Sequence, residues 1–199
     1  MMYLAFDTET TDLPRPHLDM AHSSQPHLIQ FAGVVFDDHG REMDRLCTLV
    51  KPGPNAQLSP QAFKAHGISM DLAASDGMEP IDVFRWFTQQ AKTVDQIIGH
   101  NVQFDIQVMA ILGARLTGQI WFPPCPLFCT MTHATPIVNL PPTPRMISAG
   151  RYHAKAPTLT ECISHFFNEE LTGAHHATAD VGACIRVFRH LTLERGLAA

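Results

Sequence analysis

Two carboxylates stand two residues apart near the start of the chain, in the D-T-E of residues 7–9. Side chains of a β-strand alternate between the two faces of a sheet, so Asp7 and Glu9 project from one face and can share a cation. A charged strand end in solvent is the alternative for an isolated D-x-E. Residues 3–6 are apolar on both faces, however, which predicts a buried central strand. Since carboxylates are rarely buried without a positive partner, the pair predicts a metal site.

Two further aspartates each head the apolar face of a predicted helix. From Asp105, the residues at +3, +4, +7 and +11 are Val, Met, Leu and Leu, and from Asp180 those at +4, +7, +8 and +11 are Cys, Val, Phe and Leu. This spacing is typical of a buried helix stripe. The helix dipole would explain one such aspartate. Two of them, with Asp7 and Glu9, predict four carboxylates that converge on one cation site.

The elements that must position these side chains form an alternating α/β pattern. The loop of residues 12–27 is rich in Pro, His and Ser, and turn residues at 37–40 separate two β-prone segments that predict a hairpin. The further predicted elements are strands at 94–99 and 127–130, a helix at 60–66 between Ser59 and Gly67, a helix from Pro80 with Ile81, Phe84 and Phe87 inward, a loop at 140–144, and a helix after the Thr158–Glu161 capping box.

Charge is divided unevenly along the chain. The formal net charge is −5, which by itself argues against a nucleic-acid partner. Residues 106–160 contain no Asp or Glu, however, and carry +4, so the remainder carries −9. Such a division lets a basic flank meet phosphate while acidic residues gather around metal; an apolar, Pro-rich stretch without that role is the alternative. The basic residues of the flank are Arg115, Arg145, Arg151 and Lys155.

The composition predicts a single domain that resides in a reducing compartment. A length of 199 residues with 45% hydrophobic content is ample for one packed core. Five cysteines, an odd number, and the lack of a signal peptide predict free thiols and a cytoplasmic location, and no apolar run is long enough to span a bilayer. Cys125, Cys129 and His133 suggest zinc by their spacing, but the fourth ligand of a structural zinc site is missing.

Four short motifs follow one another along the chain. They are D-T-E-T-T-D-L at residues 7–13, A-H-G-I-S at 65–69, H-N-V-Q-F-D at 100–105 and H-H-A-T-A-D at 175–180. In this order they resemble the D-x-E-T-T-G-L, H-G-I, H-N-x-x-F-D and H-x-A-x-x-D motifs of the DEDDh exonucleases, the DnaQ-like or ribonuclease T-like family. Each motif is short, but the ordered set is specific and extends over most of the chain.

The resemblance implies a fold and a set of site residues. The fold is ribonuclease H-like α/β, a mixed five-stranded sheet flanked by helices, in a single exonuclease domain of residues 1–199. Oxygen-rich sites suit Mg²⁺ or Mn²⁺, and four carboxylates can hold two such ions. His175 is the implied general base, because imidazole titrates near neutral pH, and His176 is its rival. The implied metal ligands are Asp7, Glu9, Asp105 and Asp180, and the implied substrate-binding residues are Thr10, Leu13, His66, Asn101 and Phe104.

Two departures from the family pattern lie beside the expected nucleotide pocket. Asp12 replaces the usual Gly of the first motif, and the loop from there to Leu28 is longer than the resemblance leads us to expect. Both leave the catalytic set intact and leave the choice of substrate open. Leu13 and Phe104 are either core residues or, as the resemblance implies, contacts to the terminal base and sugar, where aromatic stacking accepts any base.

We therefore expect a metal-dependent 3′–5′ exonuclease that releases 5′-mononucleotides, with single-stranded DNA favoured over RNA. The alternatives are an RNA-trimming exonuclease, a phosphohydrolase for small nucleotides, and a non-catalytic nucleic-acid or polymerase-binding module. A degenerate module would be expected to lose a carboxylate, and none is lost. A proofreading enzyme would have a DNA polymerase as partner; the chain ends soon after its last predicted helix, which favours a stand-alone enzyme. The oligomeric state is left open.

Overall fold

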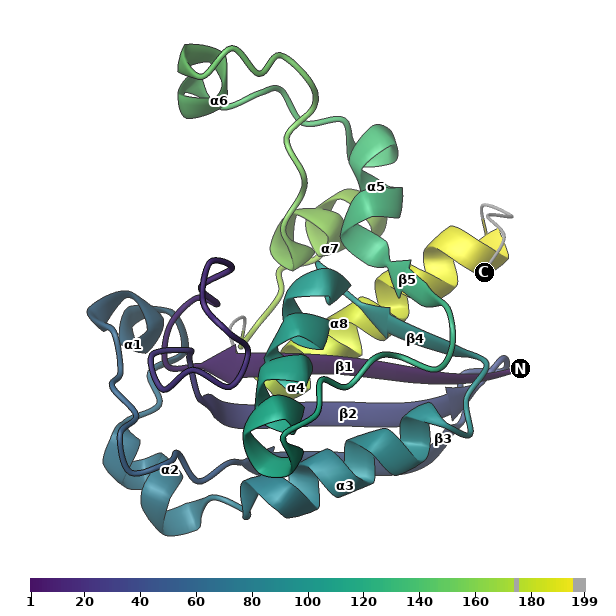
Figure 1. The fold of residues 1–199 in the computed structure, drawn as a ribbon. Coiled ribbons are helices and arrows are strands. Elements are labelled where there is room, and N and C mark those ends of the chain that lie inside the picture. The colour runs from purple at the N-terminus through teal and green to yellow at the C-terminus, as the bar shows by residue number, and fades with distance from the viewer. Residues whose placement is uncertain (174–175, 195–199) are drawn as a thin grey trace.

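A five-stranded sheet with the order β3-β2-β1-β4-β5 forms the centre of the molecule in the computed structural model, which describes residues 1–173 and 176–194 (Figure 1). β2 is antiparallel to both β1 and β3, whereas β4 and β5 run parallel to β1. The expected mixed five-stranded sheet is therefore confirmed. The strands are β1 (Met2–Thr10), β2 (Leu28–Asp37), β3 (Glu42–Leu49), β4 (Gln96–Gly99) and β5 (Leu127–Cys129).

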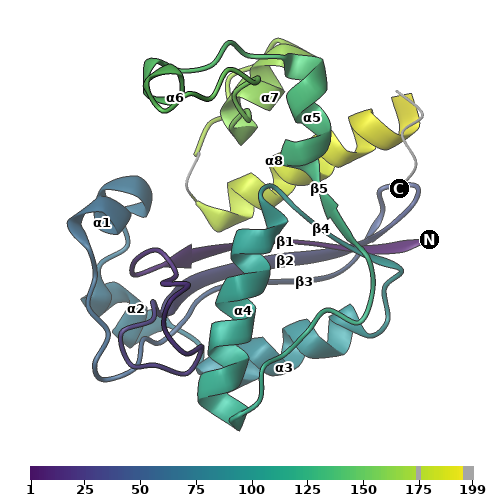
Figure 2. The same ribbon diagram turned by 45° about the horizontal axis from the view of Figure 1, so that its top comes forward.

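Helices cover both faces of this sheet, and the alternation of side chains along β1 separates the two cores. Tyr3 and Ala5 pack with α8 in one core, while Leu4 and Phe6 pack with α3 and α4 in the other. Figure 2 shows α8 and α4 on opposite sides of β1. The helices are α1 (Pro60–His66), α2 (Met70–Asp76), α3 (Pro80–Ala91), α4 (Val102–Thr117), α5 (Thr130–Val138), α6 (Pro144–Ser148), α7 (Leu159–Phe167) and α8 (Ala177–Arg189), followed by a π-helical turn at His190–Glu194.

Capping residues set the helix ends where the sequence predicts them. The Ser59 side chain caps α1 and Gly67 ends that helix with φ of 70°, a left-handed conformation that glycine adopts without strain. At α7, Thr158 and Glu161 form the reciprocal capping box. The inward placement of Ile81 is wrong: it is 39% exposed, because the buried stripe of α3 starts at Val83 instead. Helices α2, α5 and α6 have no counterpart in the sequence-based prediction.

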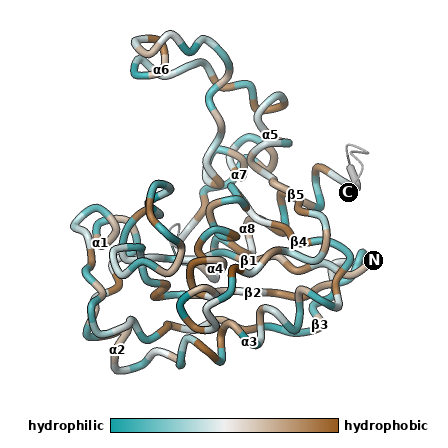
Figure 3. The backbone as a smooth tube through the Cα atoms, in the orientation of Figure 1, coloured by the Kyte–Doolittle hydropathy of each residue, from teal (hydrophilic) through white to brown (hydrophobic). Residues whose placement is uncertain are grey.

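Apolar side chains follow the faces of the helices rather than their whole circumference. Along α3, Figure 3 shows brown, hydrophobic stretches alternating with teal, hydrophilic ones. α4 is the longest helix of the described residues and is buried over most of its length because it packs on the sheet. In the part of the chain that the structure describes, no helix has both the length and the apolar character of a membrane span.

Candidate active site

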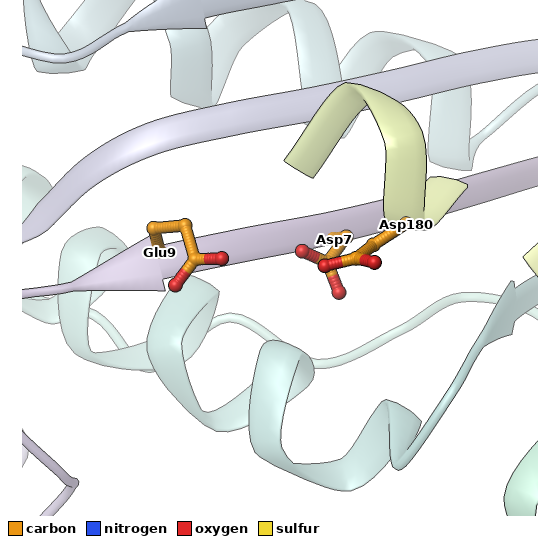
Figure 4. A group of neighbouring side chains, drawn as sticks. All are labelled: Asp7, Glu9 and Asp180. Carbon is orange, nitrogen blue, oxygen red and sulfur yellow. The ribbon is translucent and has the colours of Figure 1, made fainter. Parts of the chain in front are cut away.

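Three of the four predicted carboxylates come together at the end of the central strand. Asp7 and Glu9 continue the face of β1 that Tyr3 and Ala5 present to α8, and Asp180 lies in the first turn of α8. One oxygen from each carboxylate lies within 4.8 Å of the other two. Figure 4 shows the side chains of β1 and α8 pointing toward one another. Strand alternation thus places the D-x-E pair as the sequence predicts.

A glutamine that sequence reasoning missed holds α8 against this strand. Gln30 of β2 lies opposite Glu9 in the strand register and is buried. Its Oε1 accepts the backbone N–H of Ala177 at 3.0 Å, and its Nε2 lies 3.4 Å from Nε2 of His176. The first turn of a helix has backbone donors without intrahelical acceptors, and Gln30 satisfies one of them. It therefore fixes Asp180 beside Asp7. The only sequence signal is a polar residue within an apolar strand.

Asp105 approaches from the other face of the sheet and does not join the group of three. Its Oδ1 accepts the backbone N–H of Thr8 at 3.0 Å and the Thr8 hydroxyl at 2.7 Å. The ladder between β1 and β4 ends at Ala5, so the carboxylate takes the place of a strand neighbour for Thr8. Asp105 is 2% exposed, and its charge acts on Asp7. Three of the four carboxylates thus come together as predicted, while Asp105 lies outside the group and acts on it through its charge.

Burial and mutual repulsion disfavour negative charge throughout this group. Burial, followed by the charges of Asp105, Asp180 and Glu9, holds the pKa of Asp7 well above its usual range. Burial and the charges of Asp180 and Asp105 raise the pKa of Glu9 to about 8. The pKa of Asp105 rises to about 7 by burial, although its bonds to Thr8 act in the opposite direction. A set of oxygen donors that repel one another fits a divalent cation such as Mg²⁺ or Mn²⁺.

Two cavities that share no lining residue border different members of the carboxylate group. One, of about 390 Å³, is lined by Glu9 together with four of the five predicted substrate-binding residues, namely Thr10, Leu13, His66 and Phe104. The other, of about 380 Å³, is lined by Asp7, Asp180, His100 and residues 156–160. Leu13 is 70% exposed, so it is not a core residue, and Phe104 is half-buried. The carboxylates therefore border two spaces that can each hold part of a ligand.

Asn101, the fifth predicted substrate-binding residue, lines neither cavity. It is the N-cap of α4 with φ of 68°, and its side chain is exposed. Asparagine tolerates this left-handed conformation better than most residues. The backbone turn between β4 and α4, which brings Asp105 to Thr8, thus accounts for the asparagine at this position.

Comparison with known proteins agrees with this geometry. A family model described as RNase_T, Exonuclease, matches residues 4–188. The chain belongs to this exonuclease family. Among curated proteins, no relative matches the sequence of this exonuclease.

Solved structures of exonuclease I share the fold of this exonuclease. The E. coli enzyme in complex with a dT13 oligonucleotide superposes with a TM-score of 0.74 at 19% identity, covering 98% of this chain and 42% of that chain. Exonuclease I from Methylocaldum szegediense gives a TM-score of 0.69 at 21% identity, with 98% and 40% covered. This chain therefore spans about two fifths of the length of these structures, and the likeness shows the fold alone.

His100, the first residue of the H-N-V-Q-F-D motif, has a structural role in the exonuclease. His100 lies between Thr130 Oγ1, 3.0 Å from its Nδ1, and the Pro157 carbonyl oxygen, 2.9 Å from its Nε2. Burial lowers the pKa of His100. Because a carbonyl only accepts, the neutral ring carries its proton on Nε2, and Nδ1 accepts from the hydroxyl. His100 therefore joins the segment before α7 to the start of α5 and shapes the wall of the second cavity. His175, the predicted general base, lies outside the described residues.

The long loop of residues 12–27 is held in place by one arginine. The guanidinium of Arg115, in the last turn of α4, donates to the carbonyl oxygens of His22, Ser23, Gln25 and Pro26. The buried Gln25 amide in turn donates to the carbonyl oxygen of Arg15 at 3.0 Å and accepts the Arg15 backbone N–H. Arg115 is thus directed at the loop, so the expectation that it belongs to a phosphate-binding flank is wrong. The loop carries Asp12 and Leu13 at the first cavity.

The zinc alternative has no support in the geometry. His133 stacks on Phe128 with ring centroids 4.0 Å apart, and its Nδ1 lies 2.9 Å from the Cys129 carbonyl oxygen. Cys125 directs its thiol to the Ala91 carbonyl oxygen. Among residues 1–173 and 176–194, only Asp7, Glu9 and Asp180 bring three candidate metal-ligand atoms together.

The raised pKa values of the carboxylates predict that the free energy of unfolding of the metal-free protein decreases as pH rises. Between the unfolded pKa, about 4, and the folded pKa, about 8 for Glu9, the folded state binds more protons than the unfolded state. Folding is then penalised progressively as pH rises. Burial lowers the pKa of His27 to about 4, so it gives the opposite slope only below about pH 6.5.

We therefore expect the melting temperature in EDTA to fall between about pH 6.5 and 8.5, and Mg²⁺ or Mn²⁺ to restore it at the upper end. Glu9→Gln should flatten the fall, whereas Asp71→Asn, a change to an exposed residue of α2, should not. Thermal melts at fixed ionic strength measure this. A melting temperature in EDTA that rises across this range would contradict the assignment of the cluster as mutually repelling carboxylates.

Arg115→Ala should loosen the 12–27 loop, so that Asp12 and Leu13 are held less firmly at the first cavity. Loss of charge-assisted bonds to four carbonyls should cost about 2 kcal/mol of unfolding free energy. Arg115→Lys, with fewer donors and no planar fork, should recover only part of it. Denaturant unfolding and limited proteolysis of the loop measure the effect. Arg85→Ala, which removes an exposed arginine paired with Asp82 on α3, serves as the control; equal protease sensitivity in both variants would argue against this role.

Proposed function

We propose that this protein is a metal-dependent 3′–5′ exonuclease that releases 5′-mononucleotides from the 3′ ends of single-stranded DNA. The observation that carries the proposal is the group of Asp7, Glu9 and Asp180 beside two cavities, one of them lined by the motif residues expected to contact a nucleotide. Membership of the exonuclease family supports the reaction class. Single-stranded DNA is supported by the likeness to exonuclease I, which is seen bound to such oligonucleotides.

The proposed ligands of divalent metal are Asp7, Glu9, Asp105 and Asp180. Asp105 would contribute Oδ2, since its Oδ1 accepts both donors of Thr8. When bound, two such ions lower the pKa of the attacking water and stabilise the leaving oxygen. The carboxylates would hold the cations at the end of β1, and the scissile phosphate group would bind there through the cations. Their pKa values, raised in the absence of metal, would fall toward the usual range as the cations bind.

The terminal nucleotide would occupy the cavity that Leu13 and Phe104 line. An exposed leucine and a half-buried phenylalanine can pack on a base and a sugar from two sides, and aromatic stacking does not depend on which base is present. Asp12, which stands at the glycine position of the D-x-E-T-T-G-L motif, also lines this cavity. A carboxylate near the sugar would bear on the choice between deoxyribose and ribose, because the 2′-hydroxyl is read by a few local groups.

His175 would be the general base. It precedes Asp180 by five residues, the spacing of the family motif, and His176 follows it directly. The imidazole would take the proton of the attacking water and later give it up to solvent. The ring of His176 lies beside the buried Gln30, which supports a positioning role for His176 instead.

The proposal is tested by incubating end-labelled strands with the purified protein in Mg²⁺, Mn²⁺ or EDTA. We expect single-stranded DNA to shorten from its 3′ end, duplex DNA to shorten more slowly because its end must unpair first, and EDTA to stop both. Asp7→Asn should reduce turnover by about 10³ or more, since catalysis depends on the bound metal. Asp71→Asn is the matched control. Faster cleavage of RNA than of matched DNA, or degradation of a strand with a blocked 3′ end, would refute the substrate assignment.

His175→Ala should lower kcat by about 10²–10⁴ and leave metal affinity nearly unchanged, because a general base contributes to the proton transfer alone. Measurement of kcat against pH should show the loss of one ionisation on the acid side. His176→Ala should reduce kcat less. A larger loss in His176→Ala than in His175→Ala would transfer the role of base to the neighbour.

A further inference from the structure

An extended segment, here called the arm, projects from the sheet on the side of α5 and α7. It comprises residues 141–154 and includes α6. In Figures 1 and 2, α6 stands clear of the sheet and apart from α1–α4. We infer that the arm is a contact surface for the single strand on the 5′ side of the cleavage site. This inference rests on the proposed nuclease function and names a part of its substrate path.

The arm is closed at its base and tied to the active-site wall. Leu140 and Lys155 form an antiparallel bridge, with the Lys155 N–H donating to the Leu140 carbonyl oxygen at 3.0 Å. The Lys155 ammonium donates to Glu161 at 2.6 Å, and Glu161 also accepts the backbone N–H of Thr158 at 2.7 Å. Glu161 belongs to the capping box of α7. Movement of the arm is therefore restricted where it meets residues 156–160.

The side chains of the arm suit a nucleic-acid strand. The arm carries Arg145 and Arg151, contains no acidic residue, and presents Tyr152 with 73% of its surface exposed. Arginine neutralises phosphate and a tyrosine ring stacks on a base of any type. The combination of cations and an exposed aromatic ring, without opposing acid, is that of a sequence-neutral strand-binding surface.

The two arginines of the arm also differ from the other described arginines because no partner for their side chains lies among residues 1–173 and 176–194. Arg15, Arg41, Arg45, Arg85 and Arg186 each pair with a carboxylate, while Arg115 and Arg189 donate to carbonyl oxygens. For Arg145 and Arg151, the described residues supply neither kind of acceptor. Since both are exposed, their donors are available to an external anion.

The cavity beside Asp7 and Asp180 connects the active site to this surface. It is lined by residues 156–160, which are separated from the arm only by Lys155. If the terminal nucleotide fills the cavity at Glu9 and the scissile phosphate lies at the carboxylates, the upstream nucleotide needs a second space beside them. The cavity of residues 156–160, which Asp7 and Asp180 also line, supplies that space. A strand that continues in this direction meets the arm.

The test is binding of fluorescent oligo-dT in EDTA, which measures affinity without cleavage. Wild type is compared with Arg145→Ala/Arg151→Ala, with Tyr152→Ala, and with Arg85→Ala/Lys92→Ala. The last variant is a control that removes the same charge from α3 and its C-cap on the other sheet face. For a strand of about 15 nucleotides, the arm double variant should bind roughly tenfold more weakly. Its slope of log K against log salt should be smaller by about 1.4, which corresponds to two lost phosphate contacts at about 0.7 each.

Oligonucleotides of two lengths distinguish failure of this inference from failure of the proposed nuclease function. With Mg²⁺, cleavage of a strand of about three nucleotides should be unchanged in the arm variants, while KM for the longer strand rises and kcat does not. Affinity and salt slope equal to wild type in the double variant would overturn the inference and leave the arm as a surface for a protein. If wild type cleaves neither strand, the nuclease proposal fails, whereas weakened binding in EDTA would still support the arm.

Discussion

Negative charge gathered on a buried strand is the constraint on which the rest of the structure depends. Asp7 lies beside three other carboxylates where burial already opposes ionisation, so the apo-protein folds against their repulsion. The surrounding elements supply the force that keeps them together. Both sheet faces are covered, and the buried stripe of α8 packs on β1 and β2 from Ala177 to Phe188. Hydrophobic packing thus stabilises an arrangement that electrostatics opposes until a cation is present.

The local patterns along the chain predict much of this arrangement. Alternation along β1 places Asp7 and Glu9 on one face, and the 3.6-residue periodicity after Asp180 gives the buried side of α8. Side-chain caps at Ser59 and Thr158 fix helix starts that need no tertiary information. Where a residue's environment is set by its near neighbours in sequence, the sequence is sufficient to predict it.

Contacts between distant segments escape such patterns. Nothing near Asp105 indicates that its carboxylate bonds to Thr8, because that contact depends on where β4 ends relative to β1. Arg115 looks like part of a basic flank until its helix is placed beside residues 22–26. Ile81 fits the helical period, but it lies in the first turn of α3, before the buried face of that helix begins at Val83. In each case, the direction of a neighbouring element decides the outcome, and periodicity carries no information on it.

The bond from Gln30 to Ala177 links the integrity of the site to the pairing of a hairpin. Gln30 faces α8 only because β2 pairs with β1 in the observed register, Glu9 opposite Gln30. A slip of one residue would turn the amide to the α3 face and release the first turn of α8, with Asp180 on it. Chains that pair out of register, or are still folding, would then lack an assembled metal site. Nuclease activity would be confined to correctly folded molecules, which protects nucleic acid in the cell from the immature enzyme.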